Sequence, residues 1–172
     1  MKRIKIILGV IVALTIVFFA TGLFFKETTY TTQITVNKPI DEVFSLFNNT
    51  SKIKNWIPDV QSIEAINEKP EKTGSTYKMV VKNNNGEEIA LEEKVIAFVP
   101  NEKVTLRFKS PTMLKTDDYV FSFSDGNTTI QNNSRCIGGS YILSCLFPYF
   151  KGKLQSIDQE YLNNFKAFIE KN

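Results

Sequence analysis

The side chains available for chemistry are restricted, because the 172 residues of this sequence include no histidine. Without histidine, the chain cannot build Ser-His or Cys-His nucleophiles, histidine-ligated zinc or haem, or the usual proton shuttle near neutral pH. Cys136 and Cys145 are too few for an all-cysteine zinc site, and no cluster of oxygen donors has EF-hand spacing. We therefore expect no metal and no cofactor. Any catalysis has to use Asp, Glu, Lys, Tyr, Ser or Cys.

Glu93 is the weak candidate that this restriction leaves for acid-base chemistry. Alternation along Ile89, Leu91 and Val95 turns Glu93 to the same side as these apolar residues. A carboxyl group withdrawn from water in this way has a raised pKa and can act as an acid or a base. The alternative is that a bulge or a register shift leaves Glu93 in solvent.

Other polar residues become candidates for ligand contact if the strand that contains Ile130 turns this residue inward. Period two then also turns Asn132, Ser134 and Cys136 inward, where amide and hydroxyl groups need a partner such as a ligand or water. The adjacent pair Asp117–Asp118 is not a candidate for a shared site. Neighbours on a strand face opposite sides, so the two do not form a shared carboxylate site.

Charge is distributed unevenly along the chain. Lys2, Arg3 and Lys5 are the only charged residues among the first 25, and they account for the whole formal net charge of +3. The rest of the chain is neutral. A protein that binds nucleic acid through phosphates needs a basic surface on its folded domain, so we expect no nucleic-acid partner.

The first 27 residues are predicted to form a cytoplasmic tail and a transmembrane anchor. Residues 6–25 are uncharged and almost entirely apolar, and a helix of about 20 residues spans a hydrocarbon core of about 30 Å. The three basic residues in front of this run favour a cytoplasmic N-terminus. The prediction is a single-pass membrane protein with residues 28–172 as a domain on the extracytoplasmic side.

A cleaved signal peptide is the alternative, with Ala20-Thr21-Gly22 as the cleavage site. The apolar residues that follow this site favour an uncleaved anchor, and both interpretations place the domain outside the cytoplasm. In an oxidising compartment Cys136 and Cys145 either pair in a disulfide or remain free as small buried apolar residues. The sequence leaves both states open.

The remaining chain is predicted to contain one strand, two short helices, six strands and a long helix. Residues 28–36 alternate as a strand, Pro39 begins a helix, and a second short helix carries Ile53, Trp56 and Ile57. Turn signals at 71–74, 85–86, 100–101 and 125–126 separate antiparallel strands. An apolar stripe then predicts a final helix near 153–171 that packs on the sheet.

This order resembles the helix-grip fold of the START-like, or SRPBCC, superfamily, which includes polyketide cyclase/dehydrase and lipid-transport proteins. The resemblance covers about residues 28–170. It rests on the sequences at 39–44 (PIDEVF), 56–58 (WIP), 93–95 (EKV) before Pro100, and 162–166 (LNNFK). It implies an α+β domain whose curved antiparallel sheet wraps the C-terminal helix, with a cavity for an apolar ligand between them.

Apolar alternation and the stripe on the final helix indicate which side chains face this cavity. Plain core packing is the alternative for any single one of them. The expected cavity residues are Trp56, Tyr77, Met79, Leu106, Phe108, Tyr119, Phe121, Phe123, Asn132, Ser134, Tyr161, Phe165 and Phe168.

The connection 141–150, YILSCLFPYF, is unusually apolar for a link between the last strand and the last helix. Such a segment either packs onto the core as a lid or contacts lipid, and Lys151 and Lys153 after it could meet anionic head groups. The residues expected to form the lid or the membrane contact are Tyr141, Leu146, Phe147, Tyr149 and Phe150.

Two classes of function fit these features, and binding is favoured over catalysis. The first is a membrane-tethered module that binds or transfers an apolar small molecule such as a lipid, an isoprenoid or a polyketide-like compound. The alternative is a cyclase/dehydrase-type enzyme in which Glu93 or Tyr119 supplies a proton. A third interpretation is a partner-binding domain whose own phenylalanines fill the cavity.

Overall fold

The computed structural model describes residues 2–83 and 85–171. The first residue of the predicted anchor region (1–27) and the last residue of the predicted domain (28–172) therefore lie outside the described residues. In chain order the elements are α1 (Lys2–Phe24), β1 (Thr28–Val36), α2 (Ile40–Phe47), the 3-10 helix η1 (Thr50–Asn55), β2 (Val60–Asn67), β3 (Thr76–Lys82), β4 (Glu88–Val99), β5 (Lys103–Lys109), β6 (Met113–Ser124), β7 (Asn127–Gly138) and α3 (Tyr141–Ile169).

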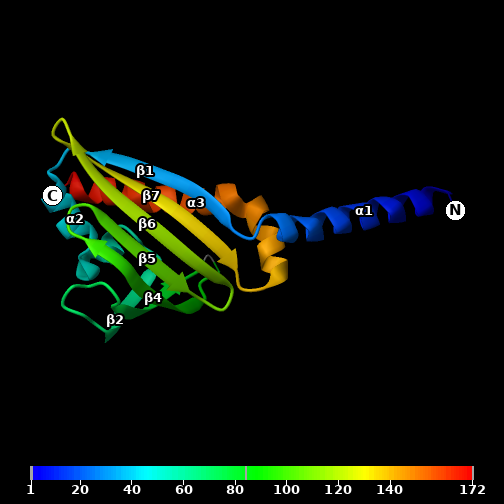
Figure 1. Cartoon of the computed structure of the whole chain (residues 1–172), viewed down its shortest axis with the longest axis horizontal. Coiled ribbons are helices and arrows are strands. Elements are labelled where there is room, and N and C mark those ends of the chain that lie inside the picture. Colours follow the sequence, from blue (N-terminus) through cyan, green and yellow to red (C-terminus); the bar gives the residue numbers. More distant parts are fainter. Residues whose placement is uncertain (1, 84, 172) are drawn as a thin grey trace.

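Seven strands of the described chain form one antiparallel sheet in the order β1-β7-β6-β5-β4-β3-β2. The first strand pairs with the last, and α2 and η1 carry the chain from this edge to β2 at the other edge. Figure 1 shows the sheet curving around α3, while α1 extends away from the domain. This arrangement confirms the predicted helix-grip α+β fold.

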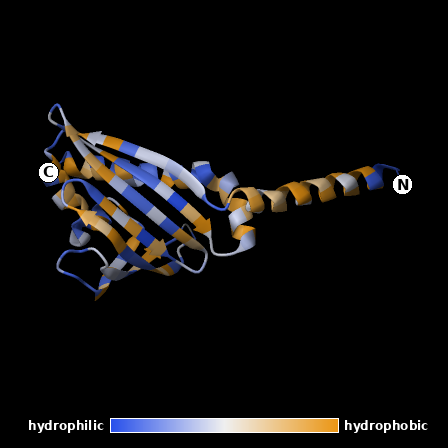
Figure 2. Cartoon of the chain, viewed as in Figure 1, coloured by the Kyte–Doolittle hydropathy of each residue, from blue (hydrophilic) through white to orange (hydrophobic). Residues whose placement is uncertain are grey.

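Strict alternation and a two-residue turn explain why the strands form where they do. Every second residue of β1, from Thr28 to Val36, is buried, and the residues between them are exposed. Strands β6 and β7 are joined by Asp125 and Gly126, whose φ angles of 53° and 79° suit a tight hairpin. Figure 2 shows the resulting alternation of apolar and polar residues along the sheet, beside the almost wholly apolar α1.

The hydrophobic core lies between the concave face of the sheet, α2 and the C-terminal part of α3. Phe47 is at its centre, with its ring 5.0 Å from that of Trp56, 5.4 Å from Phe121 and 5.2 Å from Phe165. Mostly edge-to-face contacts of this kind fill one end of the space between sheet and helix. The space toward the other end of α3 is less completely filled.

Helix α3 begins twelve residues before the predicted start at residue 153, so the apolar segment 141–150 is helical and not a connecting loop. Ser140 caps the helix by accepting a hydrogen bond from the backbone N–H of Leu143 at 3.3 Å. Pro148 lies inside the helix, where it removes one backbone donor and favours a kink. Figure 1 shows α3 changing direction in this early part.

Candidate functional site

A pocket of about 480 Å³ lies between the concave face of the sheet and α3. Strands β2 to β6, the η1 region and α3 supply its walls, which are mostly apolar. The volume falls within the range of small-molecule sites. We call this space the central pocket. Its apolar lining includes Ile53, Ile57, Ile63, Met79, Leu91, Phe98, Leu106, Phe108, Met113, Leu154 and Ile157.

Glu93 is an isolated acidic group in the wall of the central pocket. It extends from β4, between Tyr77 on β3 and Phe108 on β5, and is only 6% exposed. Within the described residues no ion pair or hydrogen bond reaches its carboxyl group. Burial without a compensating partner raises the pKa of Glu93 to about 7.

A second polar group, the buried ion cluster, lies where α3 faces β1, β6 and β7. It consists of Lys115, Asp117, Asp158, Tyr30 and Ser134. The ammonium group of Lys115 is 2.9 Å from Asp117 Oδ2 and 2.7 Å from Asp158 Oδ2. Tyr30 donates a hydrogen bond to Asp158 Oδ2 at 2.8 Å. The Ser134 hydroxyl lies 2.7 Å from Asp117 Oδ1 and 3.1 Å from Asp158 Oδ2, so its one hydrogen serves either carboxylate.

Burial and neighbouring charges shift the pKa values of three members of this cluster. Burial alone would lower the pKa of Lys115, but attraction by Asp117 and Asp158 outweighs it and raises that pKa. Burial raises the pKa of Asp117. It also raises the pKa of Tyr30, with a further contribution from Asp158, so Tyr30 stays protonated as a donor. One cation therefore faces two carboxyl groups.

Hydrogen-bonding capacity is left over around the central pocket. The indole Nε1 of Trp56 and the amide oxygen of Asn132 are buried and have no partner among the described residues. Trp56 lines the pocket, whereas Asn132 is on the inward face of β7 beside the lining residue Tyr119 and donates to Ser134 Oγ at 3.0 Å. Buried polar groups without partners are uncommon in folded proteins, so such a group in a pocket wall suits a bound ligand or water.

The structure brings about half of the expected cavity residues together. Trp56, Tyr77, Met79, Leu106, Phe108, Tyr119 and Tyr161 line the central pocket. The others lie elsewhere. Phe121, Phe165 and Phe168 pack in or against the hydrophobic core, and Asn132 and Ser134, on the inward face of β7, are hydrogen-bonded to each other and to Asp117 without lining the pocket. Phe123 is 51% exposed because it is next to the projecting β6–β7 hairpin, beyond the covered part of the sheet.

Sequence reasoning missed Lys115, Asp117, Asp158 and Tyr30, although alternation marked three of them. Lys115 and Asp117 share the inward face of β6 with Tyr119, and Tyr30 alternates with Ile34. The conclusion that Asp117 and Asp118 face opposite sides agrees with their burial, because only Asp117 is buried. Its carboxylate partner is Asp158, 41 residues away on α3, next to the apolar stripe.

The two cysteines are free and buried. Cys136 lies 3.8 Å from the Tyr30 hydroxyl, and burial raises the pKa of its thiol to about 11. Cys145 lies against the end of α1. Of the residues expected in a lid or membrane contact, Leu146 and Phe147 are half-buried, and Tyr141, Tyr149 and Phe150 are exposed.

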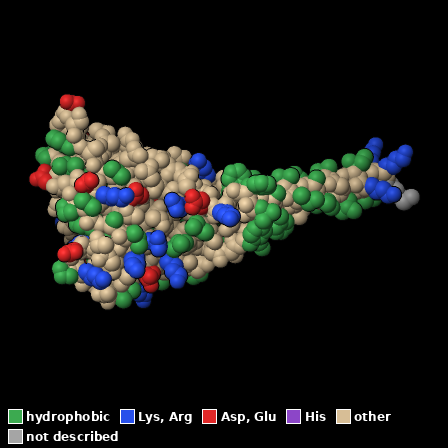
Figure 3. All heavy atoms as spheres, in the orientation of Figure 1, with side chains coloured by type: hydrophobic (Ala, Val, Ile, Leu, Met, Phe, Trp, Pro, Cys, Tyr) green, Lys and Arg blue, Asp and Glu red, His purple; other side chains and the backbone are tan. Residues whose placement is uncertain are grey.

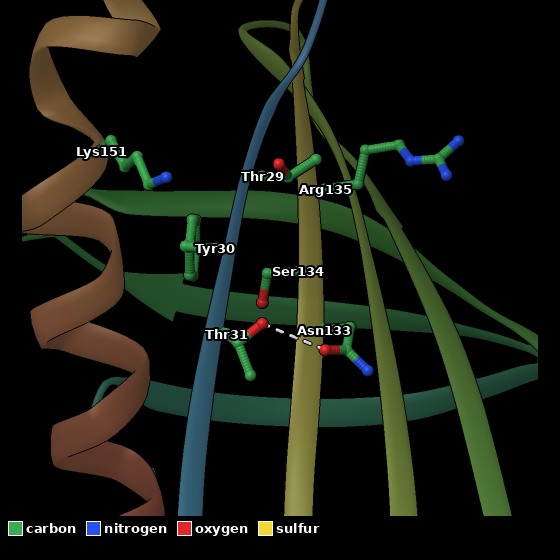
Figure 4. A pocket seen from close by; sticks show the side chains of 7 residues that line it. All are labelled: Thr29, Tyr30, Thr31, Asn133, Ser134, Arg135 and Lys151. Carbon is green, nitrogen blue, oxygen red and sulfur yellow. Dashed lines mark hydrogen bonds between the residues drawn. The ribbon is translucent and has the colours of Figure 1, made fainter.

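A second pocket of about 410 Å³, with a mostly polar lining, lies along β1 and β7 and reaches Lys151 of α3. Figure 4 shows Lys151 reaching from α3 toward β1, whereas Arg135 extends away on the opposite side. Farther along the same two strands, Thr31 donates a hydrogen bond to Asn133 Oδ1 at 3.1 Å. Because the two cations do not converge, we regard the central pocket as the candidate site. No group of acidic or cysteine side chains in residues 2–83 and 85–171 is arranged to hold a metal ion.

Comparison with known proteins identifies the fold. No protein-family model and no curated protein matches the sequence. Among solved structures, the di-domain ARO/CYC StfQ from the steffimycin biosynthetic pathway matches with a TM-score of 0.69 and 14% identity, over 84% of this chain and 52% of that one. The Zhui aromatase/cyclase from Streptomyces sp. R1128 matches with a TM-score of 0.66 and 13% identity, over 84% and 94% of the two chains.

A third similar structure is Ara h 8.0201, with a TM-score of 0.63 and 15% identity over 85% of this chain and 99% of that one. At such low identities the similarity establishes the fold alone. This chain therefore has the START-like, or SRPBCC, fold that the resemblance indicated. Ahead of this fold it carries one helix, α1, which is long and apolar enough to cross a membrane.

Proposed function

We propose that this protein binds an apolar small molecule with at least one hydroxyl group in the central pocket, next to a membrane that α1 spans. The observation that carries the proposal is a largely apolar pocket of about 480 Å³ with an unpaired carboxyl group, Glu93, in its wall. The solved structures with this fold include aromatase/cyclases, which supports a small molecule as the ligand.

The polar groups of the pocket indicate what the ligand carries. The Glu93 carboxyl group has no donor and the Trp56 Nε1 group has no acceptor among the described residues, whereas the oxygens of Asp117 and Asp158 are satisfied within the buried ion cluster. A hydroxyl group both donates and accepts hydrogen bonds, so it matches this mixture. The apolar remainder of the ligand would be recognised by burial against aliphatic and aromatic side chains.

Native mass spectrometry tests this proposal on the full chain, released from membranes in a mild detergent and incubated with a total lipid extract. A discrete adduct is expected. Leu106→Trp, which fills the pocket, should abolish it. Val120→Trp is the matched control, because Val120 is 37% exposed and does not line the pocket. A bare mass for the parent chain, or equal adducts in both variants, would refute the proposal.

Acid-base catalysis on the bound molecule is a second candidate, in line with the cyclase/dehydrase alternative. One observation favours it: the pKa of Glu93, about 7, suits proton exchange at neutral pH. Tyr119 lies in the same wall, and burial raises the pKa of its hydroxyl group. If Glu93→Gln leaves turnover of an identified substrate unchanged, this candidate is refuted and the binding function stands.

A further inference from the structure

The last turns of α1 and the first turns of α3 pack side by side. The Tyr141 hydroxyl donates a hydrogen bond to the backbone carbonyl of Phe19 at 2.6 Å, and the two rings are stacked with centroids 6.2 Å apart. Two turns later on α3, the ring of Tyr149 stacks on Phe18 at 6.5 Å. These contacts fix the start of α3 against α1 at two points.

Between Tyr141 and Tyr149 on α3, the side chain of Cys145 packs directly against Gly22 of α1. A Cβ atom added at Gly22 would come within 2.4 Å of Cys145 Sγ, so a larger residue there forces the helices apart. Thr21 Oγ1 also lies 3.3 Å from the carbonyl oxygen of Cys145. Gly9, on the same helix, has nothing within 4 Å and takes no part in this contact.

The contacts determine how deep the start of α3 lies relative to α1. The apolar run of α1 ends at Phe25, six residues after Phe19. At 1.5 Å per residue, Phe19 is about 9 Å inside the end of that run. If α1 spans a bilayer, the side chains that pack beside Phe18 and Phe19 lie at the same depth, within the hydrocarbon edge of one leaflet.

The surface of this part of α3 suits lipid better than water. Tyr141, Ile142, Tyr149 and Phe150 are 45%, 56%, 60% and 53% exposed and adjoin the apolar surface of α1. Figure 3 shows hydrophobic side chains continuing from α1 onto the adjoining end of the domain, and charged side chains beginning next to them on the body of the domain. Tyrosine rings followed by lysines, here Lys151 and Lys153, are typical of a membrane interface.

We propose that the first ten residues of α3, Tyr141–Phe150, insert into the leaflet beside α1 and hold the domain against the lipid surface. This inference rests on the membrane span included in the proposed function and goes beyond it, because a tether alone leaves the domain free to tumble. Leu154, four residues after Phe150, lines the central pocket, as do Phe108 and Met113 near the β5–β6 turn. Insertion therefore places this end of the pocket next to the lipid that would supply an apolar ligand.

Tryptophan fluorescence in vesicles tests the insertion. The full chain is reconstituted in phosphatidylcholine and phosphatidylglycerol, with and without phosphatidylcholine brominated on its acyl chains as the quencher. Tyr149→Trp should lose much of its added emission to the brominated lipid. Phe123→Trp, on the hairpin at the far end of the domain, should lose none. The unsubstituted chain gives the baseline of Trp56, which is buried in the domain.

A third probe, Leu14→Trp, separates this inference from the tether. Quenching of the Leu14→Trp and Tyr149→Trp probes supports insertion. Quenching at position 14 alone overturns insertion and leaves the tether intact, and quenching at neither position overturns both. In the Tyr149→Trp background, Gly22→Leu should reduce quenching while Gly9→Leu leaves it unchanged. Equal effects of these two substitutions would show that the α1–α3 contact does not position the segment.

Discussion

At the scale of single residues, the buried acid Glu93 links stability to pH. Its pKa is about 7 in the folded protein, against an ordinary value of 4.5. Between these values the folded state keeps a proton that the unfolded chain has released, so stability falls as pH rises through this window. Glu93→Gln removes the titration. Above pH 7 this variant should be more stable than the parent by up to about 3 kcal/mol.

Denaturant unfolding at a series of pH values measures this difference. At pH 4, below the ordinary pKa of 4.5, Glu93 is mostly protonated in both the folded and the unfolded state, so the two proteins should then differ little. Glu92→Gln is the control, because Glu92 is the exposed neighbour on the opposite face of β4. If Glu93→Gln shows the same pH dependence as this control, the carboxyl group is not desolvated as described.

Lys115 is the residue whose loss should cost most in the buried ion cluster. Lys115→Met removes the cation that the described residues place within ion-pair distance of Asp117 and Asp158, and breaking a buried pair in this way costs about 3–5 kcal/mol. Lys103→Met breaks an ion pair with Asp118 in which both side chains are partly exposed, and it should cost at most about 1 kcal/mol. Equal losses in urea unfolding would contradict this account.

At the scale of elements, two glycines on either side of the first turns of α3 should respond in opposite ways to substitution by alanine. A Cβ atom at Gly138 would lie 2.4 Å from the backbone nitrogen of Ser144, so Gly138→Ala should separate β7 from the start of α3 and cost about 1–3 kcal/mol. Gly152 is exposed within α3 and has nothing within 4 Å. Gly152→Ala should stabilise the helix by about 0.5–1 kcal/mol. Thermal unfolding of both variants checks the signs.

Elements with strong local signals could be predicted from the sequence, and those governed by competing signals could not. Alternation identified β1, and Asp125-Gly126 identified the turn between β6 and β7. The stripe of apolar residues predicted a start of α3 near residue 153, which is too late, because the helix also includes the segment 141–150 and continues through Pro148. Contact with α1 supports these early turns, and no local pattern encodes that contact.

The candidate site divides in the same way. Period two correctly indicated which side of β4 carries Glu93, because that signal lies within one strand. The meeting of Lys115 with Asp158 depends on how α3 is rotated and shifted against β6. An apolar stripe on a helix predicts which residues face the sheet only to within about one residue. Because Asp158 follows Ile157 of that stripe, the stripe alone does not show whether Asp158 faces the sheet. The ion cluster therefore follows from tertiary packing, which sequence periodicity does not specify.

At the scale of the whole molecule, the helix-grip domain and α1 make separate contributions. The hydrophobic core draws its members from β1, α2, the η1 region, β4 to β7 and α3, and includes no residue of α1. Gly22 is the only buried residue among those of α1, and the rest of the helix is exposed apart from a few positions near this end. Folding of the domain therefore depends on contacts that α1 does not supply.

Removing residues 1–27 tests this separation. The shortened chain should unfold cooperatively, with a free energy of unfolding close to that of the full chain, because the sheet, the core and the buried ion cluster remain. Its newly uncovered surface around Tyr141, Cys145 and Tyr149 should promote self-association, since exposed apolar patches favour it. Urea unfolding followed by circular dichroism measures the first effect, and sedimentation velocity at several concentrations measures the second.

Substituting Tyr149 and Phe150 by serine in the shortened chain should restore a monomer without changing the unfolding midpoint. A shortened chain that shows no cooperative transition would mean that α1 is part of the folding unit.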